Sequence, residues 1–427
     1  MRCAPDPPAS SRGAWLQVVL ASLLMLATLP GRTQGLGLVT EPLLADLHLD
    51  RLTYANLNLW ATLIGAFSCF PVGWAIDRFG LRWVTTAITL SLGVTVWRLS
   101  SFAGSIALLF ILLLATRAFG QSALSVCSIT TVGKWFANRA GMAMGAYSVL
   151  LSVFFAVAFI AVGSSVRLNG WRAAWLQIAL ALIFVVAPVA LLALREPRNN
   201  PAGSQPIDST PSQPRDKEAE FGRQSVPNFT FAEAIQTPAF WLFAGAAASF
   251  NLVSSGLGLF NEAVLAERGF DQKTFHLFLA VSTLMSLIGQ LACGWLTTRC
   301  KFQTLTLIAL ALYAAGLASI PILHACWQLW LVAILLGVAG GMIIVIFFSV
   351  WSEAFGQQHL GRIQGAAQML TVFSSGLGPV LFARCAAAYH SYAPLLLILA
   401  GAVLLLALVA KTISFPNQPC TRELGPT

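Results

Sequence analysis

The chain has 427 residues, of which 57% are hydrophobic and only 10% are charged. Soluble domains carry about 25% charged residues, so this composition excludes a soluble globular protein and indicates a chain surrounded by lipid. The net charge of +9 does not indicate a nucleic-acid partner, because no basic patch with interleaved aromatic residues is present. The eight cysteines are scattered and predict neither a metal site nor disulfides.

Apolar runs recur along the whole chain, six in each half. Most are close to the ~20 residues that cross a ~30 Å hydrocarbon core at 1.5 Å per residue. They predict an all-α integral membrane protein with twelve transmembrane helices in two six-helix bundles. The first run is long enough to tilt or kink at Pro30-Gly31. The predicted spans are 14–41, 53–75, 82–102, 104–131, 141–163, 171–194, 236–261, 274–297, 303–323, 327–351, 361–387 and 392–412.

Two short patterns of the first half return in the second half at nearly the same offset. The stretch GWAIDRFGLR at 73–82 is echoed by GWLTTR at 294–299, and RAG(x3)GA at 139–146 is echoed by HLG(x3)GA at 359–366. The offsets are 221 and 220 residues, about half the chain. Such a repeat in an apolar chain predicts two homologous halves related by a pseudo-two-fold axis.

The segment between the halves differs in composition from both of them. Residues 196–230 contain six prolines and mixed charges, which predicts a flexible linker. We therefore divide the chain into an N-terminal tail (1–13), a first bundle (14–195), the linker (196–230), a second bundle (231–412) and a C-terminal tail (413–427). A secretory signal at the N-terminus is the alternative reading of the first span, but its removal would leave eleven spans.

Basic residues predict the orientation in the membrane. With both termini inside, the inner segments hold 16 arginines and lysines and the outer segments hold 6. The positive-inside rule then predicts cytoplasmic termini and a cytoplasmic linker. We expect a multi-pass plasma membrane protein, most simply of a bacterial inner membrane.

Together with the two six-span halves and the long linker, the loop at 73–82, with the pattern GxxxDRxGxR, resembles the major facilitator superfamily of secondary transporters. The stretch RAFGQ at 117–121 resembles a second motif of that superfamily. The stretches at 134–145, 359–365 and 376–379 resemble its oxalate:formate antiporter and monocarboxylate transporter branch. This resemblance covers almost the whole chain. It implies alternating access and transport of a small organic anion.

The loop between spans 2 and 3 has the features of a conformational latch. Asp77 at the membrane edge could sit against the positive N-terminal end of a helix from the other half. Arginines there can pair with carboxylates or lipid phosphates. The second copy has Thr298 in place of the acid, which predicts an asymmetric latch; a charged turn that only anchors the helices is the alternative. The predicted latch residues are Gly73, Asp77, Arg78, Gly80 and Arg82.

Polar residues within the spans are the candidates for substrate binding, because charges inside a membrane are costly. Arg32 follows Pro30-Gly31 and is the first choice for a carboxylate, with snorkelling as the alternative; the related carriers use a basic residue in this helix. Arg117 has no clear partner in its own helix, and carbonyls together with Gln121 could hold it in a structural or coupling role. The full predicted set is Arg32, Gln34, Arg117, Gln121, Asn251, Gln290 and Gln368.

The chain departs from the branch that it resembles. Its anion carriers place a basic residue in span 8 or span 11, whereas span 8 here offers Gln290 and span 11 has no basic residue before Arg384. This departure weakens the case for a dicarboxylate substrate. No Asp or Glu stands at mid-span, so a coupling proton and an exchanged anion both stay open.

We therefore expect a secondary transporter for a monocarboxylate, acting as a monomer in contact with lipid and without a cofactor. Efflux of amphiphilic compounds and a non-transporting membrane sensor are the alternatives. An enzyme is not expected, because the best mid-span candidates are two arginines and two amides.

Overall fold

The computed structural model describes residues 11–136, 140–196 and 229–413, and within these ranges it contains helices and no strand. Eleven helices of the described part are long and apolar enough to cross a membrane. The twelfth span is α6 (Leu81–Ser100), whose 20 residues form a regular helix alongside the others. Two arginines and several threonines make α6 less apolar than its neighbours. The twelve predicted spans are therefore all present as helices.

The first half builds its six spans from helices that are often interrupted. The second span joins α4 and α5, the fourth joins α7, η2 and α8, and the sixth joins α10, η3 and α11, where η2 and η3 are π-helical. The elements are α1 (Ser11–Leu26), η1 (Leu29–Gly31), α2 (Thr33–Gly37), α3 (Thr40–Leu47), α4 (Arg51–Ala66), α5 (Cys69–Phe79), α6, α7 (Ile106–Thr116), η2 (Arg117–Leu124), α8 (Ser125–Trp135), α9 (Ala140–Asn169), α10 (Trp171–Ala181), η3 (Leu182–Val186) and α11 (Ala187–Ala193).

The second half has longer, continuous helices with clear sequence signals at their starts. Thr237 caps α14 by accepting from the Phe240 amide, and Pro238 occupies the first helical position, where its missing N–H costs nothing. The elements are α13 (Phe231–Gln236), α14 (Pro238–Ala266), α15 (Gln272–Leu296), α16 (Phe302–Ser319), η4 (Ile320–Ile322), α17 (Cys326–Phe355), α18 (Leu360–Tyr389) and α19 (Ala393–Thr412).

The first span differs from the single run predicted over 14–41. Helix α1 ends at Leu26, η1 follows, and Arg32 is extended, with φ −90° and ψ 152°, before α2 begins. The break falls where Pro30-Gly31 predicted a kink, because proline and glycine are the residues least able to continue a helix. Most of the predicted tails and linker, at 1–10, 197–228 and 414–427, lies outside the described residues.

The two halves meet through the repeated sequence patterns. Helices α4 and α5 pack on α18, while α9 packs on α15 and α17. A Cβ on Gly73 would collide with the Gly361 carbonyl, and a Cβ on Gly145 would lie 3.0 Å from the Cα of Gly294. The 73–82 stretch of the first half thus contacts the 359–366 stretch of the second half, and the 139–146 stretch contacts the 294–299 stretch. Glycine permits this approach of backbones, and the crosswise pairing is what a pseudo-two-fold axis requires.

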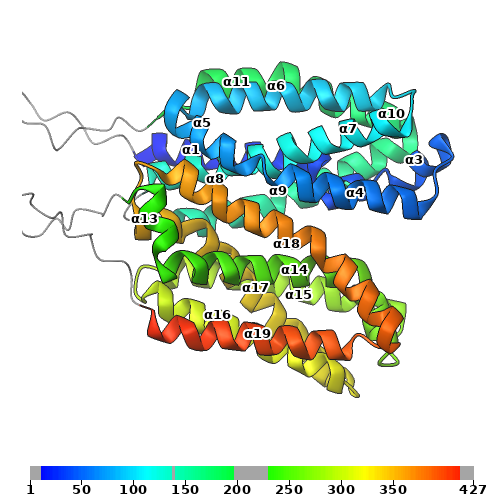
Figure 1. Ribbon diagram of the computed structural model, residues 1–427, viewed down its shortest axis with the longest axis vertical. Coiled ribbons are helices and arrows are strands. Elements are labelled where there is room, and N and C mark those ends of the chain that lie inside the picture. Colours follow the sequence, from blue (N-terminus) through cyan, green and yellow to red (C-terminus); the bar gives the residue numbers. More distant parts are fainter. Residues whose placement is uncertain (1–10, 137–139, 197–228, 414–427) are drawn as a thin grey trace, which may run out of the picture.

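The two ends of the bundle differ. The first and last described residues, and the two that border the linker, lie at one end, which we call the linker end (Figure 1). The start of α18, where Gly361 contacts Gly73, lies at this end (Figure 1). Away from it α18 bends away from the first half, and the halves separate (Figure 1). The bundle is therefore closed at the linker end.

Candidate functional site

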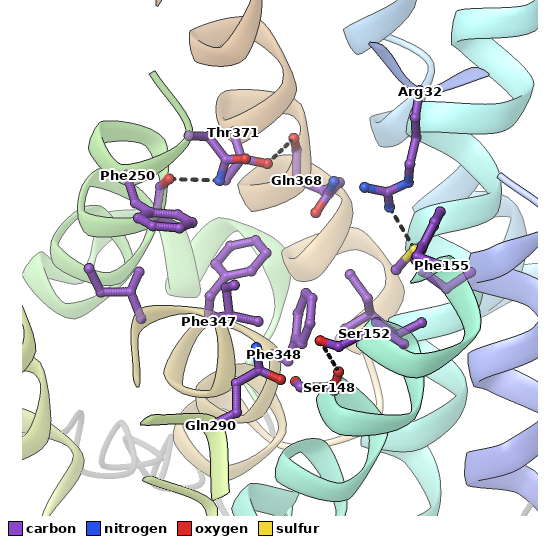
Figure 2. A pocket seen from close by; sticks show the side chains of 17 residues that line it. Arg32, Ser148, Ser152, Phe155, Phe250, Gln290, Phe347, Phe348, Gln368 and Thr371 are labelled. Atoms are coloured by element: carbon purple, nitrogen blue, oxygen red, sulfur yellow. Dashed lines mark hydrogen bonds between the residues drawn. The ribbon is translucent and has the colours of Figure 1, made fainter. Parts of the chain in front are cut away.

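A cavity of about 330 Å³ lies between the two halves (Figure 2). Its walls come from the first span, α8 and α9 of the first half and from α14, α15, α17 and α18 of the second. A central site shared by both halves is the position that rocking of the halves can expose to either side in turn. The cavity is lined by Met25, Arg32, Ile129, Ser148, Leu151, Ser152, Phe155, Ala247, Phe250, Asn251, Gln290, Ile343, Ile344, Phe347, Phe348, Gln368 and Thr371.

Arg32 is the one ionisable side chain among these lining residues. Its Nε donates to Thr28 Oγ1 at 2.6 Å, and its Nη2 donates to Ser125 Oγ at 3.2 Å. The guanidinium also lies 5.4 Å from the centre of the Phe155 ring (Figure 2). In the described part of the chain no carboxylate forms an ion pair with it. Its positive charge therefore faces the cavity with neutral partners.

The break in the first span fixes where Arg32 points. Gly31 packs directly on the fourth span, where an added Cβ would lie 2.5 Å from the Thr116 carbonyl oxygen. Arg117 Nη1 donates to Gly31 O at 3.2 Å and to Thr33 Oγ1 at 3.0 Å. These two bonds hold the chain on both sides of Arg32. Arg117 thus acts as a clamp on the interrupted segment.

Arg117 itself is buried and does not line the cavity. Besides its bonds to the first span, it donates to Asn58 Oδ1 at 3.0 Å and to Gln121 Oε1 at 2.8 Å. It lies at the start of π-helical η2, a type of irregularity that is frequent at functional sites. Its partners are a carbonyl, a hydroxyl and two amides, so the charge is dispersed over neutral dipoles within the first half.

Two other predicted substrate-binding residues also lie away from the cavity. Gln34 is exposed beyond the break, and Gln121 is engaged by Arg117 and donates to Ser375 Oγ at 3.5 Å. The sequence placed them in the right spans. The sequence could not predict which way these side chains face. The break changes the direction of the chain after Arg32 and so turns Gln34 away, and the bond from Arg117 fixes the side chain of Gln121.

The predicted amides of the second half do line the cavity. Asn251 Nδ2 donates to Ala247 O at 2.9 Å, within its own helix. Gln290 is buried; its Nε2 donates to Ser286 Oγ at 3.3 Å, and its Oε1 has no partner among the described residues. Gln368 extends from α18 toward the side of Arg32 (Figure 2). Together with Arg32, three amides give the cavity polar groups in both halves.

The aromatic part of the lining could not be predicted from the sequence. Phe155, Phe250, Phe347 and Phe348 all face the cavity (Figure 2). The chain has 28 phenylalanines, and nothing in the spacing of these four separates them from rings that face lipid or core. Only the packing of the two halves brings these four rings to the cavity.

At the linker end Asp77 caps a helix of the other half. Its Oδ1 accepts from the Gly361 amide at 3.1 Å and its Oδ2 from the Arg362 amide at 2.9 Å, at the start of α18. Lys134 Nζ lies 4.0 Å from Oδ1. Nearby, Gln357 Nε2 donates to the Gly133 and Lys134 carbonyls at 3.1 and 2.9 Å. A carboxylate at a helix N-terminus is stabilised by the helix dipole, so these contacts favour closure of this end.

The other latch residues shape the turn and face outward. Gly80 has φ +87°, a conformation that glycine adopts without strain. The guanidinium of Arg78 lies 5.3 Å from the centre of the Trp74 ring, and that of Arg82 lies 5.5 Å from the Trp83 ring. Neither arginine forms an ion pair with a carboxylate in the described ranges. Arginine stacked on exposed tryptophan is typical of a membrane interface.

The second half lacks an acid at the position equivalent to Asp77, but another acid lies beside the start of the equivalent helix. Thr298 is exposed and donates to Trp295 O at 2.7 Å within its own turn. Glu353, near the end of α17, instead lies beside the start of α9, close enough for the backbone N–H groups of Ala140 and Gly141 to act on its carboxylate. The sequence repeat could not predict this contact, because the acid comes from a different helix.

Comparison with known proteins identifies the family. The model of the Major Facilitator Superfamily matches residues 20–379 and 252–424, so the chain belongs to this superfamily of membrane transporters. It is a transporter and not an enzyme. Among solved structures, the human organic anion transporter MFSD10 (TETRAN) is similar, with a TM-score of 0.66 and 16% identity over 94% of this chain and 100% of that one. At that identity the similarity shows the fold alone. No curated protein matches the sequence.

Proposed function

We propose that this protein is a secondary active transporter that moves a small organic anion, a monocarboxylate being the simplest case. The observation that carries the proposal is Arg32, the one ionisable side chain among the described residues that line the central cavity, bonded there to the hydroxyls of Thr28 and Ser125. A guanidinium presents parallel donors that match the two oxygens of a carboxylate. A charge without a counter-ion in a low-dielectric site is costly, so an anionic substrate would stabilise it.

We propose alternating access as the mechanism. Closure at the linker end rests on the Asp77 cap of α18 and on the glycine contacts between the halves. Rocking of the halves would break these contacts and open that side. The bias of basic residues supports a cytoplasmic linker end, in which case the structure is an outward-facing state. Reporter fusions at residue 210 and at the C-terminus should then both report cytoplasm.

The transport test uses purified protein in proteoliposomes with labelled lactate, pyruvate, formate and oxalate, each with and without a pH gradient and an internal anion. The gradient and the internal anion distinguish a coupling proton from exchange. Arg32→Lys keeps the charge but loses the planar fork, so we expect the apparent KM to rise several-fold. Arg32→Gln should abolish anion transport while membrane insertion is preserved.

Arg98 provides the matched control, because it is an exposed arginine near the end of α6. Arg98→Gln should transport at the wild-type rate. Wild-type rate and affinity in Arg32→Gln would show that this arginine does not bind the substrate.

Efflux of amphiphilic compounds is the second candidate, and the aromatic lining favours it. Four phenylalanines give most of the cavity an apolar wall, which suits a substrate with a sizeable apolar part. The two candidates differ in direction and size of the solute. Uptake into right-side-out vesicles compared with export from preloaded ones separates them.

A further inference from the structure

We infer that the transported anion has two polar ends, a carboxylate bound by Arg32 and a hydroxyl or amine donor bound by Gln290, joined by an apolar body of about the size of a phenyl ring. The inference rests on the proposed function as an anion carrier. It adds the chemistry of the far end of the substrate.

The starting point is an unused acceptor on Gln290. This side chain lines the cavity, yet the residue is only 4% exposed. Its Nε2 has Ser286 Oγ as a partner at 3.3 Å, while its Oε1 has none among the described residues. Buried amide oxygens are nearly always satisfied. An O–H or N–H of a bound solute would complete this one, with a small rotation of the side chain.

Gln290 and Arg32 lie at different depths in the cavity. The backbone oxygen of Gln290 is 3.4 Å from the position of a Cβ on Gly145, whereas the guanidinium of Arg32 lies over the Phe155 ring. Gly145 and Phe155 are ten residues apart on α9, about 15 Å along its axis, and the long side chains of Arg32 and Gln290 span part of this separation inside the cavity. The two groups therefore enter the cavity at different levels, and an anion longer than a two- or three-carbon acid is better suited to contact both.

The wall between these two ends is mostly apolar, because the Ser148 and Ser152 hydroxyls donate to carbonyls of their own helix. Figure 2 shows Phe348 between Arg32 and Gln290, with Phe347 and Phe250 to one side. Flat rings stack and pack edge-on against such a wall. The volume of about 330 Å³ is at the lower end of the range for sites that hold drug-sized ligands, which is larger than lactate needs. An aryl-alkanoate with a distal hydroxyl or amine matches all three regions.

Such a substrate would connect the two halves of the transporter. Arg32 belongs to the first half and Gln290 to the second, so only a two-ended anion interacts with both. A ligand shifts a conformational equilibrium by its different affinity for the two states. Transport of a two-ended anion should therefore be faster than transport of an equally sized anion that lacks the distal donor.

The experiment measures binding of four ligands to the purified full-length protein by calorimetry: 3-(4-hydroxyphenyl)propanoate, 3-phenylpropanoate, 3-(4-methoxyphenyl)propanoate and lactate. Wild type should bind the hydroxylated acid about 10-fold more tightly than the unsubstituted one, since a site built to bond a hydroxyl discriminates against its absence. The methyl ether cannot donate and should show no such gain. This ligand series tests the inference without any mutation.

Gln290→Met keeps the length of the side chain but removes the acceptor, so the hydroxylated and unsubstituted acids should bind with nearly equal affinity. Gln303→Met is the matched control. Gln303 also has an unpartnered Oε1, but it lies on α16 and lines a different pocket near Lys411. This control should keep the 10-fold preference.

Equal binding of the hydroxylated and unsubstituted acids by wild type would overturn the inference, as would a preference that persists in Gln290→Met. Binding of neither aryl acid would also overturn it. The proposed function fails separately, when neither the four acids of the transport screen nor the aryl acids are transported in a way that depends on Arg32. Arg32-dependent transport of lactate without aryl-acid binding would keep the proposed function and remove the inference.

Discussion

The two halves of this transporter share one architecture but differ in their central helices. In the first half, the first span breaks at Arg32 and the fourth contains π-helical η2. Their counterparts in the second half, α14 and α17, run without interruption for 29 and 30 residues. The intramembrane charges follow the same division, because Arg32 and Arg117 belong to the first half while the second half contributes amides and phenyl rings to the cavity.

The difference shows what an irregular backbone can provide inside a membrane. A broken helix leaves carbonyls and hydroxyls unpaired within its own span, and these can hold a cation that a regular helix cannot. Gly31 O and Thr33 Oγ1 do this for Arg117, and Arg117 in turn fixes the segment that presents Arg32. In a regular helix the backbone groups are already paired, so only side chains can contact a solute or a cation. The uncharged amides and rings of the second half fit this limit.

After Arg32 itself, replacement of Arg117 should cause the largest loss. Arg117→Met removes the clamp on both sides of Arg32, so we expect the apparent KM for the anion to rise by at least about 10-fold, with a smaller change in turnover. Arg117→Lys retains the charge and should recover part of the affinity. Uptake kinetics in proteoliposomes measure both, with Arg98→Met as the exposed control. A drop in folded protein with an unchanged KM would show that Arg117 only stabilises the fold.

Adding a methyl group at the break should destabilise the first half. In Gly31→Ala the new Cβ would lie 2.5 Å from Thr116 O and 2.8 Å from the Gly120 Cα, backbone atoms that cannot move freely. Overpacking of this kind costs about 1–3 kcal/mol. Thermal unfolding in detergent should therefore show a lower Tm. Gly37→Ala is the control in the next helical turn, where an added Cβ meets nothing within 4 Å; an equal drop there would contradict the argument.

The linker end should respond unequally to changes in its two copies. Asp77→Asn removes the charge that caps α18 and faces Lys134, an interaction of about 0.3–2 kcal/mol. Turnover should fall several-fold while substrate still binds, because the closed state is weakened. Thr298→Asp should change transport little, since Thr298 is exposed and bonded within its own turn. Equal, small effects of the two changes would show that this loop only anchors the helices.

Replacement of Glu353 should give the smallest effect. Glu353→Gln keeps an oxygen beside the Ala140 and Gly141 amides but loses the charge at the start of α9. We expect turnover to fall about 2-fold, less than for Asp77→Asn, because no cation forms an ion pair with Glu353 in the described part of the chain. The double variant should be slower than either single one. A Glu353→Gln protein slower than Asp77→Asn would reverse the assigned order of the two caps.

The fold could be predicted from the sequence because lipid imposes a simple rule, in which each apolar run of sufficient length is a helix. The break at Pro30-Gly31 could be predicted for a similar local reason. The site could be predicted only in part. Arg32, Asn251, Gln290 and Gln368 are polar residues in apolar runs and line the cavity as expected, whereas the faces of Gln121 and Gln34 depend on Arg117 and on the break. The phenylalanines and Glu353 depend on pairing between helices, which periodicity does not reveal.

The low apolarity of α6 has a consequence for the membrane around the protein. Arg82 and Arg98 stand at its two ends, sixteen residues apart, or about 24 Å along the axis. This is shorter than an average hydrocarbon core of ~30 Å, so both side chains must stretch toward the headgroups, or the bilayer must become thinner beside α6. Trp83 and Trp97, both exposed next to these arginines, mark the same two levels. Where these side chains do not reach the headgroups, the lipid annulus is expected to be thinner along this one helix than around the rest of the protein.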